Sequence, residues 1–156
     1  MSQQAINAID RAKIETLIRE ARASNRKRSH LLLHSGHNDQ VQRLLIALQP
    51  GTYVRPHRHS QQWEVLILLQ GQGQLQRFSD AGQVLERIEM TPQTPIVQIP
   101  MGTWHGFVVT QTDTVVMEIK PGPYRANEFA DWAPDEQDPL VVDYLERLAT
   151  EEPGHA

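Results

Sequence analysis

The stretch Gly51-Thr-Tyr-Val-Arg-Pro-His57-Arg-His59-Ser-Gln-Gln-Trp-Glu64-Val-Leu-Ile-Leu-Leu-Gln-Gly71 contains the pattern that decides the fold. His57 and His59 are separated by one residue, so they lie on the same face of a strand, where side chains alternate with a period of two. Glu64 follows after a turn, and an adjacent strand can bring its carboxylate beside the two imidazoles. The stretch therefore predicts two neighbouring strands that carry three possible metal ligands.

Similar apolar runs of strand length continue on both sides of this stretch, and Gly or Pro turns separate them. Few runs are long enough for a helix before the next Gly or Pro, and short strands at this spacing are typical of an all-β sandwich or barrel. The expected strands cover residues 41–48, 53–59, 63–70, 74–79, 83–88, 96–99, 106–110 and 114–120.

A helix is predicted on each side of these strands. Residues 7–23 carry an apolar stripe at helical spacing, and so do residues 139–149, where Asp138 is the expected N-cap and Pro139 the first helical residue. The two stripes could also support a homodimer. They consist of Ile14, Leu17, Ile18 and Ala21, and of Val141, Tyr144, Leu145 and Leu148.

Length and composition limit the possible classes of protein. A chain of 156 residues is expected to form one compact domain. Within it, we expect an N-terminal helix and lead-in strand (1–40), a barrel (41–122) and a C-terminal extension with a helix (123–156). A net charge of −4 indicates no nucleic-acid partner. The sequence has no long apolar run and no signal peptide, which predicts a cytoplasmic protein without a membrane partner.

The possible metal ligands are limited by the absence of cysteine, which leaves imidazole, carboxylate and water. The segment Pro100-Met-Gly-Thr-Trp-His105 offers a third imidazole. Three imidazoles and a carboxylate suit one divalent ion of Fe, Mn, Zn, Ni or Co. The predicted site is therefore His57, His59, Glu64 and His105, and the metal in it would be either functional or structural.

The same residues resemble the two motifs of the cupin superfamily. The first motif, G-x5-H-x-H-x4-E-x6-G, matches from Gly51 to Gly71 at every fixed position. The second, G-x5-P-x-G-x2-H-x3-N, matches at its centre, whereas Thr94 replaces its first glycine and Val109 its last asparagine. The resemblance implies a jelly-roll β-barrel, flanked here by the two helices, and the same four metal ligands. Cupins also commonly form homodimers.

Further segments resemble the WbuC family of cupin-fold metalloproteins, over about residues 20–137. This resemblance implies a link to the biosynthesis of O-antigen and other polysaccharides. The segments are His30 to His34, Arg43-Leu-Leu-Ile-Ala-Leu, Pro50 to His59, Lys120-Pro-Gly-Pro-Tyr124 and Trp132-Ala-Pro134.

Several other residues are candidates for a small-molecule site. Tyr53 and Arg55 share the parity of His57, so both should face the barrel interior, where Arg55 would meet either an anionic ligand or Glu118. Glu118 and Lys120 share one strand face near the barrel mouth. Trp104, like Trp63, either stacks on a sugar or packs in the core or an interface.

Two basic groups have a simpler interpretation. Arg26-Lys27-Arg28 either lies on a solvated face or binds a phosphate group, and a run of charged residues is more often solvated. His30, His34 and His37 lack a carboxylate at ligand spacing, so we expect solvated or core-satisfied histidines rather than a second metal site.

Two functions remain open from the sequence. One is a metal-dependent enzyme that acts on a carbohydrate or another small oxygenated or anionic metabolite, with Glu64 or Glu118 transferring a proton. The other is a non-catalytic cupin that binds or senses a small ligand around a structural metal.

Overall fold

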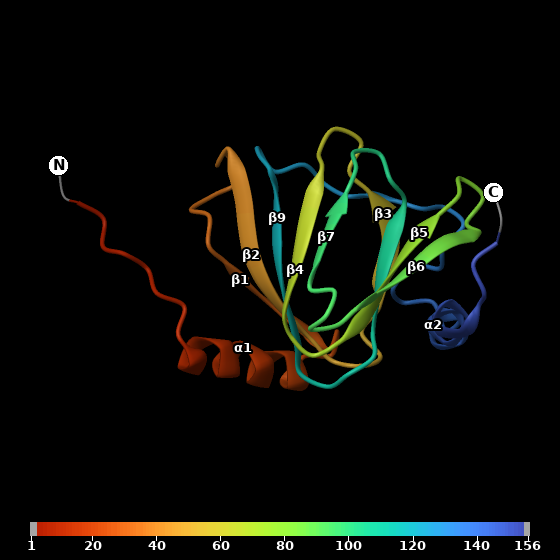
Figure 1. Ribbon diagram of the computed structural model, residues 1–156, viewed down its shortest axis with the longest axis horizontal. Helices are drawn as coiled ribbons and strands as arrows, with labels where there is room; N and C mark the ends of the chain where they lie inside the picture. Colours follow the sequence, from red (N-terminus) through yellow and green to blue (C-terminus); the bar gives the residue numbers. More distant parts are fainter. Residues whose placement is uncertain (1–2, 155–156) are drawn as a thin grey trace.

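Two five-stranded antiparallel sheets face each other and form the body of the protein, as the computed structural model shows (Figure 1). The structure describes residues 3–154; the outermost residues of the two expected terminal segments, 1–2 and 155–156, lie outside that range. Helix α1 (Arg11–Ala23) packs on the first sheet and helix α2 (Val141–Thr150) lies beside the second. The predicted all-β cupin jelly roll with two flanking helices is confirmed.

The strands of the first sheet follow the order β1-β2-β9-β4-β7. β9 is central because it pairs with both β2 and β4 along most of its length. The strands are β1 (Arg28–Leu32), β2 (Val41–Leu48), β9 (Thr114–Pro121), β4 (Glu64–Gln70) and β7 (Ile96–Ile99).

The strands of the second sheet follow the order β10-β3-β8-β5-β6. β8 is central here, and its five residues are all buried. The strands are β10 (Glu128–Phe129), β3 (Val54–Arg58), β8 (His105–Val109), β5 (Gly73–Phe78) and β6 (Val84–Met90).

The eight strands with predicted ranges are all present, with ends that shift by no more than about two residues, as is usual for such boundaries. The lead-in strand expected within residues 1–40 is β1. β10 was not predicted, because a strand of two residues leaves no period-two pattern.

Both helices begin later than predicted. α1 begins at Arg11 rather than at residue 7, because the Asp10 carboxylate caps it by accepting a hydrogen bond from the Lys13 N–H at 2.9 Å. In α2 the N-cap is Leu140. Asp138 instead closes the preceding turn, where its carboxylate accepts from the Leu140 N–H at 2.9 Å. The prediction that Asp138 caps α2 is therefore wrong by two residues.

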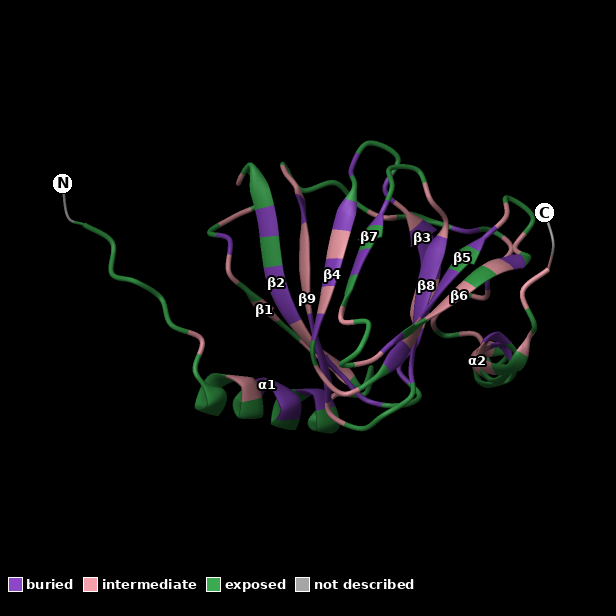
Figure 2. Cartoon of the chain, viewed as in Figure 1, coloured by how far each residue is buried: buried purple, intermediate pink, exposed green. Residues whose placement is uncertain are grey.

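Three apolar clusters hold these layers together, and their residues appear as the buried faces in Figure 2. One lies between the sheets, around Met90 and Phe107. The second joins α1 to the first sheet, and the third joins α2 and the C-terminal extension to the second. Both helix stripes are thus covered within the chain, so the argument that they support a dimer is wrong.

The end of the first motif has a steric reason. Gly71 has a φ of +84°, which favours glycine, and a Cβ there would collide with Thr114. Thr94, in contrast, lacks a positive φ, and its N–H closes a turn onto the Thr91 carbonyl at 2.9 Å. A glycine is therefore not required at position 94.

Candidate metal centre and the adjoining pocket

The four predicted ligands meet where three strands begin or end. His57 lies on β3 directly opposite His105, the first residue of β8, and Glu64 is the first residue of β4. His59 follows one residue after β3. One ligand atom from each of the four lies within 4.8 Å of the others, and all four side chains are buried. Among the described residues, this is the one group of His, Asp and Glu side chains with such geometry.

Two of the imidazoles are oriented by backbone carbonyls. His57 Nδ1 lies 2.9 Å from the Arg55 carbonyl oxygen, and His105 Nδ1 lies 2.9 Å from that of Thr103. Because a carbonyl oxygen only accepts hydrogen bonds, each Nδ1 carries the proton. Each Nε2 therefore keeps its lone pair for a metal ion, as in many metal-binding histidines.

The other pair contains buried polar atoms without partners. His59 Nε2 and Glu64 Oε2 lie 2.9 Å apart, yet the contact lacks hydrogen-bond geometry, and both atoms remain unsatisfied. Glu64 Oε2 is also 3.3 Å from His105 Nε2. Leaving such groups unpaired costs about 1–3 kcal/mol each. A divalent cation would satisfy them, and the three-nitrogen, one-oxygen donor set suits Fe, Mn, Zn, Ni or Co.

The protonation states of His57 and Glu64 also suit metal binding. Burial, followed by the neighbouring His105, lowers the pKa of His57 to about 3, so this imidazole is neutral. Burial raises the pKa of Glu64, but the close contacts with His105 and His59 and their charge outweigh burial, so the net pKa is well below its usual value. The same pairing with Glu64 outweighs burial at His105 and raises its pKa.

A second carboxylate lies beside this cluster. Burial and the charge of Glu64 raise the pKa of Glu118 to about 7, against the opposing effect of Lys120. Lys120 Nζ donates to Glu118 Oε1 at 2.8 Å, and both side chains are largely buried. Glu118 can therefore gain or lose a proton near neutral pH without leaving its place.

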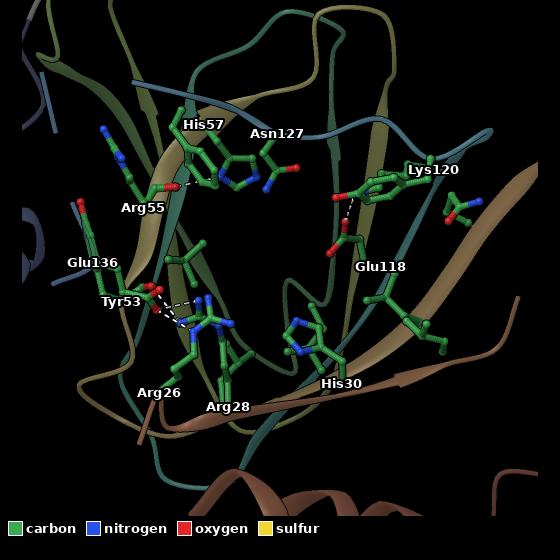
Figure 3. Close-up of a pocket in the computed structure, with 18 of the residues that line it drawn as sticks. Arg26, Arg28, His30, Tyr53, Arg55, His57, Glu118, Lys120, Asn127 and Glu136 are labelled. Carbon is green, nitrogen blue, oxygen red and sulfur yellow. Dashed lines mark hydrogen bonds and ion pairs between the residues drawn. The ribbon is translucent and has the colours of Figure 1, made fainter. Parts of the chain in front are cut away.

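A pocket of about 570 Å³ opens next to the cluster (Figure 3). His57 forms part of its wall, and Glu118 and Lys120 enter it from β9. Apolar residues of β2 form another part of the lining: Leu44, Ile46 and Leu48. One of the metal ligands, His57, thus contacts a cavity large enough for a small metabolite, within the 300–1,000 Å³ that is typical of ligand sites.

The predicted parity along β3 is wrong. Val54 pairs with Phe107 and His57 with His105, so the register shifts between them through a β-bulge. Val54 packs against the core between the sheets, whereas Tyr53 belongs to the cluster outside the second sheet and donates from its hydroxyl to the Pro134 carbonyl at 2.8 Å.

Arg55 is displaced by the same bulge. Its guanidinium contacts Asp135, donates to the Ala130 carbonyl at 3.0 Å and lies over the Phe129 ring. The predicted pair with Glu118 is wrong, because Lys120 occupies that carboxylate. Tyr53 and Arg55 do line the pocket, so their proposed role in ligand binding stays a prediction.

Trp104 does not line this pocket, and its proposed role in substrate binding stays a prediction. Its ring packs on the outer cluster of the second sheet, under the Arg58 guanidinium at 4.4 Å, and its Nε1 donates to Asp80 at 3.0 Å. Trp104 adjoins the ligand His105 in sequence, and adjacent strand residues point to opposite faces.

The three N-terminal histidines, His30, His34 and His37, lie apart from the group formed by His57, His59, Glu64 and His105. His34 is buried, with Nδ1 2.9 Å from the Arg43 backbone, and His37 stacks on Tyr124. All three also line the pocket, and His30 does so beside Arg28 of the same strand. The alternation of Arg28, His30 and Leu32 on β1 is the period-two signal that could have placed them there.

One family model matches the sequence of this chain. The profile described as "Domain of unknown function (DUF6016)" matches residues 9–90, more than half of the chain. The chain belongs to the DUF6016 family. The matched part of this DUF6016 chain includes His57, His59 and Glu64, whereas His105 lies beyond it. No curated protein matches the sequence.

Solved structures share the fold of this DUF6016 chain. A cupin-2 domain protein from Rhodospirillum rubrum superposes with a TM-score of 0.56 at 18% identity, over 78% of this chain and 80% of that one. KdgF from Halomonas sp. superposes with a TM-score of 0.51 at 18% identity, over 63% of this chain and 80% of that one. A sugar phosphate isomerase of the cupin superfamily from Silicibacter pomeroyi superposes with a TM-score of 0.52 at 25% identity, over 67% of this chain and 66% of that one. These likenesses show that the chain has a cupin fold. In the described part of the chain, no helix is long and apolar enough to span a membrane.

Proposed function

We propose that this protein is a metal-dependent enzyme that acts on a carbohydrate or another small oxygenated metabolite. The observation that carries the proposal is the buried His57, His59, Glu64 and His105 group, of which His57 also forms the wall of a 570 Å³ pocket. A purely structural ion would not require a ligand that faces such a cavity. The cupin neighbours include a protein described as a sugar phosphate isomerase and another described as oxalate oxidase.

The four residues would hold one divalent ion of Fe, Mn, Zn, Ni or Co. When bound, such an ion polarises a carbonyl or hydroxyl oxygen or activates a water molecule. Glu118 faces the same pocket, and its pKa of about 7 suits a group that takes up and returns a proton at neutral pH. Lys120 stabilises the charged form of Glu118, and Tyr53, Arg55 and Lys120 would contact the substrate from the pocket wall. Glu64 is the alternative proton carrier if it leaves the metal.

Elemental analysis of protein purified without nickel affinity or added metal tests the site. We expect close to one metal ion per chain, and almost none after the double change His57→Ala and His59→Ala. His37→Ala is the matched control, because that imidazole is exposed and stacks on Tyr124 outside the cluster. Stoichiometric metal in the double variant would contradict the proposed ligands.

A non-catalytic cupin with a structural metal is the second candidate. It is favoured by the four protein ligands themselves, all buried, of which His57 alone lines the pocket. Protein loaded with Mn²⁺ distinguishes the two candidates through the relaxation of water protons. Rapidly exchanging water at the metal is expected for the enzyme, whereas its absence would favour the structural metal.

Other features of the proposal rest on the sequence. The WbuC resemblance supports a role in O-antigen or polysaccharide biosynthesis in the cytoplasm, without nucleic-acid or membrane partners. We also propose that the chain is divided into an N-terminal segment (1–40), a barrel (41–122) and a C-terminal extension (123–156), and that the protein forms a homodimer. Leu69 and Ile96, exposed on the outer face of β4 and β7, support the dimer. Light scattering would measure the mass in solution, and a strain without the protein should show altered surface polysaccharide.

A further inference from the structure

Strand β1 contributes a cationic wall to the pocket. Arg28, His30 and Leu32 alternate along this strand and all line the pocket, opposite Leu48, Ile46 and Leu44 of β2. Figure 3 shows Arg28 and His30 entering the cavity that Glu118 and His57 also face. The pocket therefore has positive charge on one wall and the proposed metal ligand and proton carrier on another.

The Arg28 guanidinium is held in place by the protein. Nη1 donates to Thr52 Oγ1 at 3.2 Å and to the Tyr53 carbonyl at 3.0 Å, and Nη2 donates to Glu136 Oε1 at 2.8 Å. An arginine has five N–H donors, so two are left for another acceptor. The side chain is only 12% exposed, so its orientation is set before any ligand arrives.

Positive charge on this wall exceeds the negative charge that neutralises it. Arg26 Nε also donates to Glu136 Oε1, at 2.9 Å, so two guanidinium groups share one carboxylate. Elsewhere in the pocket, Arg55 is paired with Asp135 and Lys120 with Glu118. The surplus is unexpected in a chain of net charge −4. Burial, and then Arg28, Arg26 and Lys120, lower the pKa of His30, as this positive environment requires.

We propose that Arg28, supported by Arg26 and His30, binds the carboxylate or phosphate group of an anionic substrate. This inference deepens the proposed function and rests on it: the anionic group lies on the β1 wall, and the rest of the molecule extends over the apolar lining toward His57 and Glu118. A guanidinium binds both kinds of oxyanion through paired N–H donors, so carboxylate and phosphate share one chemistry here. The substrate class is a small acid or phosphorylated metabolite, such as a sugar acid or sugar phosphate.

Glu136 competes with this ligand. It lies on the C-terminal extension and is about one-third exposed, so an incoming anion can share or replace its contact with Arg28. If Arg28 served only to fasten the extension, removing the charge of Glu136 would lower stability and leave anion binding unchanged. If Arg28 binds substrate, the same change would strengthen anion binding, because a competing carboxylate is lost.

The test measures binding of inorganic phosphate and of malonate to the full-length, metal-loaded protein by calorimetry, with glycerol as a neutral probe. Arg28→Gln is expected to weaken anion binding at least about tenfold, the effect of losing one charge-assisted contact. Glu136→Gln should strengthen it about threefold. Arg43→Gln is the control, because Arg43 lies outside the pocket and is paired with Asp39. Preference for phosphate or for malonate decides between the two kinds of oxyanion.

Metal content measured on each variant keeps the two proposals separate. Wild-type protein that carries metal but binds neither anion overturns the inference and leaves the metal site intact. Anion binding that persists unchanged in Arg28→Gln places the anion on the metal and also overturns it, as does weaker binding in Glu136→Gln. Loss of the proposed function would appear instead as wild-type protein without metal. Should Arg28→Gln fail to fold, Arg28→Lys keeps the charge but loses the paired donors, and weaker binding is expected there too.

Discussion

The metal cluster and the cationic wall on β1 both place charged groups inside the barrel, but the polar atoms of these groups differ in how many hydrogen-bond partners the protein provides. His59 and Glu64 retain buried polar atoms without partners, whereas the guanidinium of Arg28 has three protein acceptors. Unsatisfied buried groups favour a tightly bound ion, because only the ion completes them. A guanidinium that is already paired can remain without a ligand, and any anion must compete with Glu136. We therefore expect tight metal binding and weaker, exchangeable anion binding.

Acid should have the largest effect on the metal cluster, because it should remove the metal completely. Histidine must be neutral to bind a metal ion, and an unperturbed imidazole titrates near about pH 6.5. Without metal, Glu64 raises the pKa of His105, so His105 takes up a proton before His57, whose pKa of about 3 keeps it neutral. Because the bound metal opposes protonation, release should occur below about pH 6.5. Metal analysis after dialysis at each pH measures it; full occupancy down to about pH 4 would contradict a three-histidine site.

Chelation should remove the metal at neutral pH without unfolding the sheets. The core between the sheets is formed by apolar residues such as Leu66 and Val116, which need no ion. A ligand at about 1,000 times its Kd adds about 4 kcal/mol to the free energy of unfolding. For a chain of this size, that corresponds to a fall in Tm of about 10 °C after chelation. Far-UV circular dichroism and a thermal melt test this, and loss of strand signal at 25 °C would make the metal structural.

Two carboxylates that lie side by side should differ in their effect on metal affinity. Glu64→Gln removes a proposed ligand, so affinity for Zn²⁺ should fall at least about 100-fold, beyond the 10–100-fold usual for outer contacts. Glu118→Gln is the matched control, because it removes a buried carboxylate beside Glu64 without removing a ligand. Its effect should stay at about tenfold, the lower end of the range for an outer contact. Competition with a chromophoric chelator measures both variants, and equal losses would mean that Glu118 also binds the metal.

Arg55→Ala should have the smallest effect and would sharpen the contrast with Arg28. Arg55 lines the pocket, but its partner Asp135 is 78% exposed, so the pair contributes about 1 kcal/mol or less to stability. We expect phosphate binding to weaken about threefold, against about tenfold or more for Arg28→Gln, with unchanged metal content. A larger loss of phosphate affinity in Arg55→Ala than in Arg28→Gln would mean that the anion binds beside β3 rather than β1.

Much of the fold and the ligand set could be predicted from the sequence, because both depend on local periodicity. The eight apolar runs became strands, and the helix stripes became buried faces. The spacing of His57, His59 and Glu64 needs only one strand, one turn and the start of the next strand. His105 required knowledge of a motif, since its distance from the others in the chain carries no periodic signal.

The tertiary structure decided which side chains share a space. The bulge between Val54 and His57 arises from pairing with β8, so the parity within β3 could not reveal that the Arg55 guanidinium pairs with Asp135. Arg28 and Glu136 meet across 108 residues, and the pKa of Glu118 depends on burial and on Glu64 from another strand. Alternation and motif spacing are properties of neighbouring residues, and they were determined by the sequence alone. Burial, charge pairing and strand register depend on segments that only the folded chain brings together.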